Sequence, residues 1–433
     1  MSRVPPVRFG TFLAPHHPVG ENPTLQFQRD LRFATQLDEL GYDEFWCGEH
    51  HSSGWEMIAS PEMFLAAAGQ LTGTIKLGTG VVSLPYHHPF NVAQRMVQLD
   101  HMTRGRAMFG SGPGALPSDA WTLGIDPLVQ RDRQDEALGV IIKLLRGEPR
   151  FSYESEWFTL RDAELQLLPV QHDMPMVTAS SISPSGMQIA GKHGIGVLSI
   201  ASNSTEGLMA LPTQWGFAEE SAGQNGQTVD RKDWRVMMSW HIAETREQAR
   251  AEAVDGLQRW NNEYNVWTLG RPGANHVDDK WALLDQVAGS GAAGAGAAVV
   301  GTPDDLVAAI RHLQTVTGGF GVVLGFAHDW ANLEATRRSW DLVARYVIPE
   351  INGHTAKLRS SMQFLNENQS TLMAGAGAAV MQKILAHQGA SAAMATTMQQ
   401  MAAQKAQANE AREAAFRPGG GFDPDAVPST AAE

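Results

Sequence analysis

Short apolar runs alternate with helical segments along most of this chain. The runs have the length of strands, and between them apolar residues recur every three or four positions, which is the spacing of one helix face. Each run is almost continuously apolar, as expected for strands buried on both faces of a parallel sheet. Eight strands are predicted, spanning Arg8–Ala14, Glu44–Gly48, Ile75–Leu84, Arg106–Gly112, Pro175–Ser180, Gly196–Ala201, Trp234–Ala243 and Phe320–Ala327.

This alternation predicts an α/β fold, a (β/α)8 TIM barrel with insertions and a C-terminal helical and disordered extension. A doubly wound open sheet is the rival, and the early Gly-rich phosphate motif that it would favour is missing. The glycines of Gly289–Gly294 match a dinucleotide motif only formally, because they follow a helical stretch in a Gly/Ala-rich segment. We expect Gly289–Gly294, which lies within the long excursion Tyr264–Gly301, to be a flexible loop, and Phe151–Leu167 to be an inserted hairpin.

Composition changes near residue 350, which divides the chain into two predicted domains. Residues 1–350 form the barrel, and residues 351–433 form an Ala-, Gln- and Met-rich extension with a disordered end. Two helices are expected in this extension, at Thr371–Gln388 and Ser391–Phe416. Its methionines are expected to pack and not to bind a cofactor.

Charge and cysteine content narrow the class of protein. A formal net charge of −13 argues against nucleic acid or an anionic membrane as the main partner. Cys47 is the single cysteine, so no intrachain disulfide can form, and its place in an apolar run indicates a buried hydrophobic role. Met1–Arg8 lacks the apolar stretch of a leader and no segment is suited to span a bilayer, so a cytoplasmic protein is expected.

Ionisable residues follow directly on the predicted strands. Glu49, His50 and His51 end the second strand, and the C-terminal ends of barrel strands open into the active site. A metal site with Glu49 as a ligand is one alternative, although no histidines have the spacing that places two imidazoles on one side of a strand. Another alternative is that these histidines lie in loops and bond to the backbone. We expect this of at least one histidine in each adjacent pair. For His50 we favour proton transfer near neutral pH. The histidine pairs are His16–His17, His50–His51 and His87–His88.

Hydroxyl groups and glycines also gather at strand ends, in Thr79–Gly80, Gly110–Gly114 and Ser180–Ser183. Ser183 is expected to be the N-cap of a helix that has Pro184 at its first position. The start of a helix offers free N–H groups and a positive dipole end to an anion. Phosphate binding and simple capping by Ser183 both fit this pattern.

Together these motifs resemble the bacterial luciferase-like, flavin-dependent monooxygenases, and within them the limonene 1,2-monooxygenase group. The resemblance covers Arg8–Pro349 and depends on the motifs jointly, because each alone is weak. The motifs are Phe9–Phe12, Gly41–Trp46 with Glu49–His51, Leu77–Thr79, Leu84–Pro85, His88–Pro89, Leu99–Asp100, Gly105–Arg106, Phe109–Gly110 and Gly301–Pro303.

The resemblance implies a barrel without a metal that binds FMN at its C-terminal face. A separate NAD(P)H-dependent reductase supplies the reduced FMN, O2 adds to form a C4a-hydroperoxide, and one oxygen atom passes to a small apolar substrate such as a cyclic alkene, ketone or aldehyde. A homo-oligomer is also implied.

The same resemblance assigns roles to individual residues. His50 handles a proton beside the flavin. Thr79, Gly80 and Val81 lie at the flavin ring, with a non-prolyl cis peptide at Gly80–Val81. Ser180, Ser181 and Ser183 hold the phosphate. Trp46, Trp55, Met57 and Tyr86 are candidate walls of the substrate pocket, although ordinary packing of loops is the favoured explanation for any one of them alone.

The chain departs from luciferase itself at three positions. Pro113 stands where luciferase has an arginine that contacts phosphate, Ser180 where it has a glutamate, and Gly112 where it has a cysteine. We therefore expect redistributed phosphate contacts and no light emission. Two alternatives share the barrel: hydride transfer with the deazaflavin F420, and a flavin-binding protein without turnover.

Overall fold

The predicted alternation of strands and helices forms a closed barrel. The computed structural model describes residues 6–14, 16–200, 205–271, 273–288 and 297–414, with side chains as far as Glu410. In these residues eight parallel strands make a continuous ring, because β10 pairs with both β9 and β12 and β1 joins β12 to β2. The barrel strands are β1 (Arg8–Leu13), β2 (Glu44–Cys47), β3 (Lys76–Thr79), β5 (Ala107–Gly112), β8 (Met176–Ser180), β9 (Gly196–Ser199), β10 (Trp234–Ile242) and β12 (Val322–Phe326).

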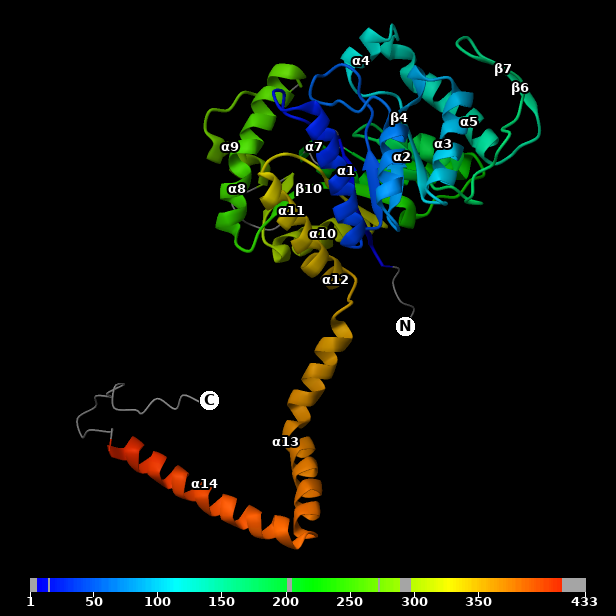
Figure 1. The fold of residues 1–433 in the computed structure, drawn as a ribbon. Coiled ribbons are helices and arrows are strands. Elements are labelled where there is room, and N and C mark those ends of the chain that lie inside the picture. The colour runs from blue at the N-terminus through cyan, green and yellow to red at the C-terminus, as the bar shows by residue number, and fades with distance from the viewer. Residues whose placement is uncertain (1–5, 15, 201–204, 272, 289–296, 415–433) are drawn as a thin grey trace. The chain divides into compact units, whose positions relative to one another are not determined.

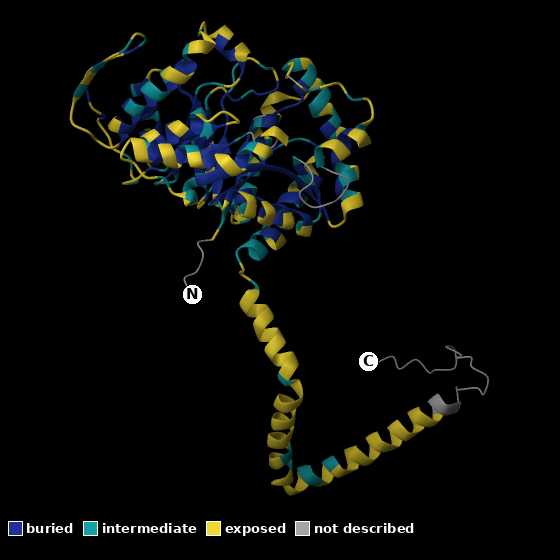
Figure 2. Ribbon diagram, turned by 180° about the vertical axis from the view of Figure 1, so that it is seen from behind, coloured by how far each residue is buried: buried dark blue, intermediate teal, exposed yellow. Residues whose placement is uncertain are grey.

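Helices cover the outside of the ring (Figure 1). Their buried faces and the outward faces of the strands share one large apolar core, and a second core fills the barrel interior. Figure 2 shows the strands as a buried layer inside helices whose outer faces are exposed. The helices are α1 (Pro23–Glu39), α2 (Pro61–Leu71), α3 (Pro89–Met102), α4 (Pro117–Thr122), α5 (Gln130–Leu145), α6 (Ser185–His193), α7 (Thr205–Gln224), α8 (Arg246–Arg259), α9 (Lys280–Ala288), α10 (Pro303–Thr317), α11 (Leu333–Leu342) and α12 (Ile348–Ile351), with short turns η1 (Leu84–Tyr86), η2 (Pro127–Val129), η4 (Arg231–Asp233), η5 (Trp260–Thr268) and η6 (Val343–Val347).

The third predicted strand, Ile75–Leu84, is interrupted. It forms β3 and a separate β4 (Val82–Ser83), which pairs with β5. The peptide bond Gly80–Val81 between them is cis, which confirms the expectation from the family resemblance.

The excursion Tyr264–Gly301 contains regular secondary structure. Its described residues include most of the π-helical turn η5, helix α9 and a strand, β11 (Ala298–Gly301), which extends β10 in parallel. Leu283 and Leu284 of α9 are buried in an apolar cluster with α8 and β11, and this packing explains the order. The glycine-rich motif Gly289–Gly294 lies outside the described residues.

Two further segments complete the chain. The predicted hairpin is confirmed as β6 (Phe151–Glu154) and β7 (Thr159–Ala163), which are antiparallel. The structure divides into units Met1–His354 and Thr355–Glu433. The second unit contains α13 (Ala356–Leu385) and α14 (Gln388–Ala414), so its first helix begins well before the predicted Thr371, and its described side chains are mostly exposed.

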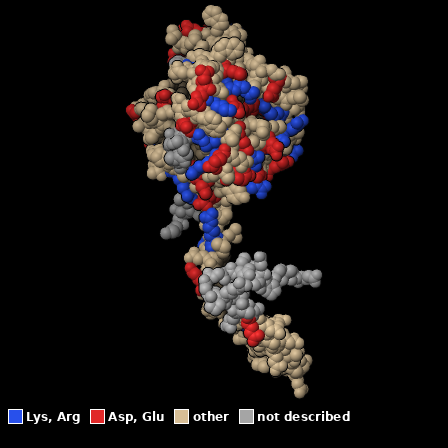
Figure 3. Space-filling view, turned by 90° about the vertical axis from the view of Figure 1, so that its left-hand side faces the viewer, with Lys and Arg blue, Asp and Glu red and all other residues tan. Residues whose placement is uncertain are grey.

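Surface charge on the face of the first unit seen in Figure 3 follows no single sign. Figure 3 shows Lys and Arg interspersed with Asp and Glu on the face in view. No helix in the described part of the chain has the length and apolar character needed to cross a membrane.

A buried ion pair closes the N-terminal end of the barrel interior. Glu44 of β2 accepts hydrogen bonds from Nε of Arg235 at 2.7 Å and from Nη1 of Arg8 at 2.8 Å. The indole of Trp46 donates to the same carboxylate at 2.8 Å and lies under the Arg235 guanidinium. Burial raises the pKa of Glu44, but the two arginines lower it further, so its pKa is below the usual value. Strands on opposite sides of the ring are thereby joined through their side chains.

We predict that Glu44→Gln destabilises the first unit by about 3–5 kcal/mol, because it leaves the buried charge of Arg235 without its partner. Denaturant unfolding followed by tryptophan fluorescence measures the change. The matched control is Glu164→Gln, which breaks the exposed Arg150–Glu164 pair and should cost at most about 1 kcal/mol. Equal midpoints for wild type and Glu44→Gln would contradict a structural role for the buried pair.

Candidate functional site

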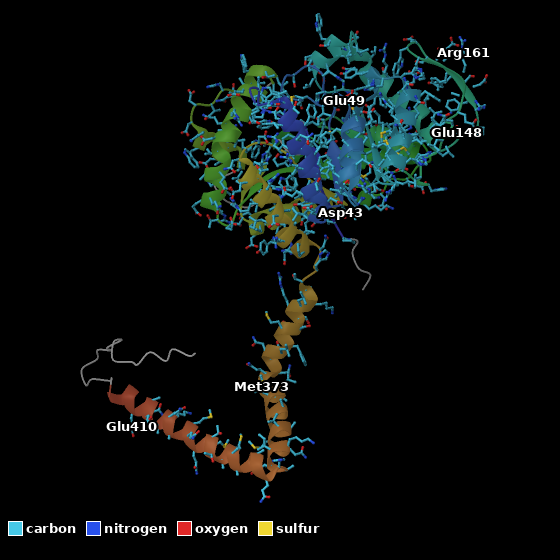
Figure 4. All side chains as sticks on the ribbon, in the orientation of Figure 1. Asp43, Glu49, Glu148, Arg161, Met373 and Glu410 are labelled. Carbon is cyan, nitrogen blue, oxygen red and sulfur yellow. The ribbon has the colours of Figure 1, made fainter. Side chains whose placement is uncertain are left out.

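The C-terminal ends of the strands bring separate loops to one mouth of the barrel. Asp43 and Glu49, labelled in Figure 4, lie at the two ends of β2, and the mouth is on the Glu49 side. Register places Cys47 between Leu13 of β1 and Thr79 of β3, so the residues that follow these strands start from neighbouring positions. Cys47 itself is fully buried, and burial raises the pKa of its thiol, in agreement with the hydrophobic role predicted for it.

His50 lies between two buried carboxylates. Its Nδ1 is 3.0 Å from Oδ2 of Asp119, and its Nε2 is 3.4 Å from Oε1 of Glu56. Asp119 belongs to α4, and its second oxygen accepts from the His51 amide and the Ser52 hydroxyl. Burial lowers the pKa of His50, but the charges of Glu56 and Asp119 raise it more, so the imidazolium form is favoured.

Glu56 connects three different segments of the mouth. Its Oε1 is 3.4 Å from Nε2 of His50 and 3.3 Å from Nε2 of His16, and its carboxylate also accepts from the hydroxyl of Tyr264 in η5. Burial raises the pKa of Glu56, but the charge of His50 and the bonds from His16 and Tyr264 lower it to about 2. Glu56 is therefore a carboxylate at neutral pH.

His16 has the opposite protonation tendency to His50. It is nine-tenths buried, with its ring edge-on to Tyr264 at 4.4 Å and to Phe326 at 5.3 Å between ring centres. Burial lowers the pKa of His16 by more than Glu56 raises it. Among the described residues its Nδ1 has no hydrogen-bond partner. Two imidazoles thus flank one carboxylate oxygen, one favoured as a cation and the other as the neutral base.

A second carboxylate, Glu49, organises the adjacent histidines. Its Oε1 is 2.8 Å from Nε2 of His51 and 2.7 Å from Nε2 of His87, and its Oε2 accepts from the Ser83 amide at 2.8 Å. Carboxylates thus hold the imidazoles of His51 and His87, and His17 likewise contacts Asp30 at 2.6 Å. The expected backbone bond of at least one histidine in each pair stays a prediction. In the described residues no three or more His, Cys, Asp or Glu side chains are grouped so as to hold a metal ion.

The serine segment lies where β8 meets α6. The prediction that Ser183 caps this helix is wrong: α6 begins at Ser185, Pro184 occupies the cap position without a side-chain cap, and the Ser183 hydroxyl pairs with that of Ser185 at 2.9 Å. The Ser183 hydroxyl bonds the Ser185 hydroxyl in place of an amide of the first helical turn. Ser181 is exposed, whereas the Ser180 hydroxyl is buried and, in the part of the chain that is described, has no partner.

The start of α6 approaches the end of β8 closely. A Cβ added to Gly186 would lie 2.3 Å from the Ala179 carbonyl oxygen and 2.8 Å from Cα of Ser180, so only glycine fits there. The start of α6 therefore packs directly against the backbone of Ala179 and Ser180.

The residues around the cis peptide have different environments. The Thr79 hydroxyl is buried and exchanges hydrogen bonds with both the carbonyl and the amide of Gly110, so it joins β3 to β5. A Cβ at Gly80 would be 3.1 Å from the Phe12 ring, and one at Gly112 would be 2.4 Å from Val81. Val81 is half-buried and packs against β5 through the space that Gly112 leaves.

The four predicted pocket residues have different surroundings. Trp46 fills the barrel interior, where a Cβ on Gly78 would lie 2.4 Å from its ring, so it packs as core. Trp55 is buried against Tyr264, and Met57 is half-buried. The Tyr86 hydroxyl accepts from Gln130 at 2.9 Å, and burial together with the charge of Asp119 raises the pKa of Tyr86 to about 12.

A cavity of about 920 Å³ lies between α1, α8 and α11. It reaches the mouth at His16 and His328 and is elsewhere lined by both apolar and charged residues of the three helices and of the segment that precedes α11. Its lining includes Arg29, Asp30 and Glu252, so its walls are charged.

Sequence reasoning missed three residues of the site. Asp119, Glu56 and Tyr264 follow no strand directly and match no motif, and their side chains meet His50 or His16 only through loop geometry. The Pro117 that opens α4 was the one local signal near Asp119.

Comparisons with known proteins agree with this architecture. The sequence model of the luciferase-like monooxygenases matches residues 7–319. Limonene 1,2-monooxygenase of Rhodococcus erythropolis is 47% identical over 365 residues, which are 84% of this chain and 92% of that protein. 4-Hydroxyprotoasukamycin monooxygenase of Streptomyces nodosus subsp. asukaensis is 44% identical over 375 residues, 86% of this chain and 99% of that protein.

A solved structure extends the comparison to three dimensions. The oxygenating constituent of 3,6-diketocamphane monooxygenase of Pseudomonas putida, in complex with FMN, superimposes with a TM-score of 0.67 and 26% identity over 79% of this chain and 98% of that chain. The barrel, its cis peptide and the matched sequence all support the resemblance first seen in the motifs. The chain belongs to the luciferase-like monooxygenase family.

Proposed function

We propose that this protein is the oxygenase of a two-component, FMN-dependent system that transfers one oxygen atom from O2 to a small apolar substrate. The observation that carries the proposal is the identity of 47% and 44% with two proteins that are both named monooxygenases, over 84% and 86% of the chain. The FMN complex of the diketocamphane enzyme and its description as an oxygenating constituent support FMN as the cofactor and a separate NAD(P)H-dependent reductase as its source.

The residues at the end of β8 fit a flavin phosphate. An unpaired buried hydroxyl costs about 1–3 kcal/mol, so the Ser180 group favours a ligand that supplies a hydrogen-bond partner. The neighbouring start of α6 has no side-chain cap, and its amides together with the helix dipole attract an anion. Ser181 is exposed beside them. We therefore assign the phosphate to Ser180, Ser181 and the first turn of α6, with Ser183 contributing through its bond to Ser185.

FMN, when bound, supplies the activation of dioxygen that no amino acid side chain can perform. The chain's own tasks are to bind and orient the cofactor and substrate, to exclude water and to manage protons. His50 is the proton-handling residue we assign, because two carboxylates hold its ring in place and favour its charged form. Thr79 acts indirectly, since its hydroxyl ties the end of β3, which leads into Gly80–Val81, to β5.

The names of the relatives and the aromatic rings of the mouth support the proposed substrate class. Rings of Trp55, Tyr264 and Phe326 gather beside His16, and such surfaces favour an apolar ligand with few polar groups. A cyclic alkene or ketone of small size fits this description, and an aldehyde is a further candidate.

The function is tested by mixing the purified protein with FMN, NADH, a flavin reductase and labelled O2 in the presence of limonene, a cyclic ketone or a long-chain aldehyde. We expect one labelled oxygen atom in the product of at least one substrate, detected by mass spectrometry. Tight binding of F420 with hydride transfer and no labelled product would replace the proposal with an F420-dependent reaction. Flavin binding without any product would favour a binding protein.

We predict that Ser180→Ala combined with Ser181→Ala weakens FMN binding by about tenfold, since two hydrogen bonds to a charged phosphate are lost. Titration of flavin fluorescence gives both dissociation constants. Riboflavin, which has no phosphate, should bind the variant and the wild type equally well. Ser155→Ala, in the remote hairpin, serves as the control. Equal weakening of FMN and riboflavin would move the phosphate to another site.

We predict a pH dependence governed by His50. Its pKa is raised, so the imidazolium persists above the usual pH range and is lost as pH rises through that pKa. Activity that needs the charged ring therefore declines on the alkaline side. Asp119→Asn removes a neighbouring negative charge and should move this decline to lower pH by about one unit.

The control for this prediction is Asp135→Asn, which alters the remote His193 pair and should leave the pH profile unchanged. His50→Ala should lower turnover by about a hundredfold or more and abolish the alkaline decline, with FMN affinity nearly intact. An alkaline limb that is the same in all variants would exclude His50 as the titrating group.

A further inference from the structure

The cavity of about 920 Å³ between α1, α8 and α11 has the size of a ligand site. Pockets that enclose small-molecule ligands have volumes of about 300–1,000 Å³. Leu13 at the end of β1 and Ala327, which follows β12, lie in its wall. Among the described residues that line it, none belongs to 79–81 or 180–186. The cavity is therefore separate from the cis peptide and from the segment to which the phosphate is assigned.

Aromatic and aliphatic side chains form part of the cavity wall. Trp330 and Trp340 are buried, and the ring of Phe33 is edge-on to Trp340 at 5.1 Å between ring centres. Trp330 stacks on His328 at 3.7 Å. These rings hold one another in place, so the wall is a preformed surface for an apolar group. Apolar residues of the lining include Leu13, Phe33, Ala251, Trp330, Leu333 and Trp340.

Three acidic residues of the lining gather around Arg29. Asp329 pairs with its Nη1 at 3.1 Å, and Asp30 lies 3.5 Å from its Nε. Glu21 is the third. Burial lowers the pKa of Arg29, but these three negative charges raise it more. The carboxylates in this part of the wall therefore already have a cation to face.

The two acidic residues that α8 contributes to the lining are paired too. Glu252 forms an ion pair with Arg338 of α11, and Asp255 forms one with Lys280 of α9. Every acidic residue of the lining thus has a cationic neighbour within the described part of the chain.

Two arginines of the lining have no such partner. Arg259 is the last residue of α8, Arg337 belongs to α11, and both are exposed. In the described residues neither guanidinium forms an ion pair or a hydrogen bond. An arginine can bind a carboxylate through two parallel N–H···O hydrogen bonds. The unpaired charge of the wall is thus positive, and it favours an anionic group.

We propose that this cavity binds an amphipathic carboxylate. The apolar chain or ring of the ligand lies against Trp330 and Trp340. Its carboxylate accepts hydrogen bonds from Arg259 and Arg337. Binding is non-covalent, so no bond forms or breaks. The site goes beyond the proposed monooxygenase function, because the substrate proposed there is an uncharged alkene, ketone or aldehyde.

The site is tested by isothermal titration calorimetry of the whole protein with three probes that share one alkyl chain: octanoate, octan-1-ol and octylamine. At about pH 7.5 the acid is negative, the alcohol neutral and the amine positive. We expect octanoate to bind at one site per chain, at least about tenfold more tightly than octylamine. An excess of FMN should leave the octanoate affinity unchanged, because the phosphate segment lies outside the cavity.

Two substitutions separate the charge interaction from the apolar one. Arg259→Gln combined with Arg337→Gln should weaken octanoate binding by about tenfold and leave octan-1-ol binding unchanged, since only the interaction with the carboxylate is lost. The matched control is Arg131→Gln combined with Arg146→Gln, which removes the same charge from exposed arginines at the two ends of α5. This control should change neither affinity.

A third variant reduces the space in the cavity. Ala251 is exposed on α8 and lines the cavity, so Ala251→Trp occupies the cavity without disturbing the core. We expect it to weaken the binding of octanoate and octan-1-ol alike. Circular dichroism checks that each variant is folded.

Four results would overturn the proposal. The first is absence of octanoate binding at millimolar concentration, and the second is equal affinity for octanoate and octylamine. The third is an unchanged octanoate affinity in the double arginine variant or in Ala251→Trp, since the probe then binds elsewhere. The fourth is competition by FMN, since the probe then occupies the cofactor site. Because no step uses oxygen or turnover, failure here is distinct from failure to form an oxygenated product.

Discussion

Hydrogen bonding of β10 to both β9 and β12 closes the sheet into a ring, and the site depends on this closure. In a closed parallel barrel every strand ends at the same mouth, so loops that are distant in sequence start from neighbouring positions. The Glu44–Arg235 pair supports the ring from inside, because it joins β2 to β10 across the interior. Its position at the opposite end of the barrel leaves the mouth free for chemistry.

In the mouth of the barrel, buried carboxylates are paired with imidazoles. Buried carboxylates are costly unless they are paired, and here Glu49, Glu56 and Asp119 each contact at least one histidine ring. The pairs do more than neutralise charge. Because burial and the neighbouring charges differ from ring to ring, the pKa of His50 is raised and that of His16 is lowered. At a pH between their two pKa values, His50 and His16 therefore hold different charges. Packing of the rings alone would not require this difference.

Sequence reasoning located strands better than it located side-chain partners. The position of His50 could be predicted because it follows an apolar run that could only be a buried strand, and the serine segment could be found in the same way. Ser183 was misassigned as a cap because a serine followed by a proline just before a helix fits a common pattern. In the structure Pro184 directly precedes α6, and the hydroxyls of Ser183 and Ser185 bond to each other. Trp46 points into the barrel because Gly78 leaves room for its ring, a relation between strands that no single segment shows.

The sequence by itself determined the barrel, its strands, the family and the strand-end residues His50, Gly80 and Ser180, because period and local motifs depend on neighbours in the chain. Tertiary structure alone decided that Glu56, Asp119 and Tyr264 surround the imidazoles of His50 and His16. Of these three residues, Tyr264 comes from the excursion after β10. Tertiary structure also decided that His16 borders a cavity with charged residues in its wall. These contacts join loops whose separation in sequence is large, and loop conformation is set by packing on the closed ring and not by local preference.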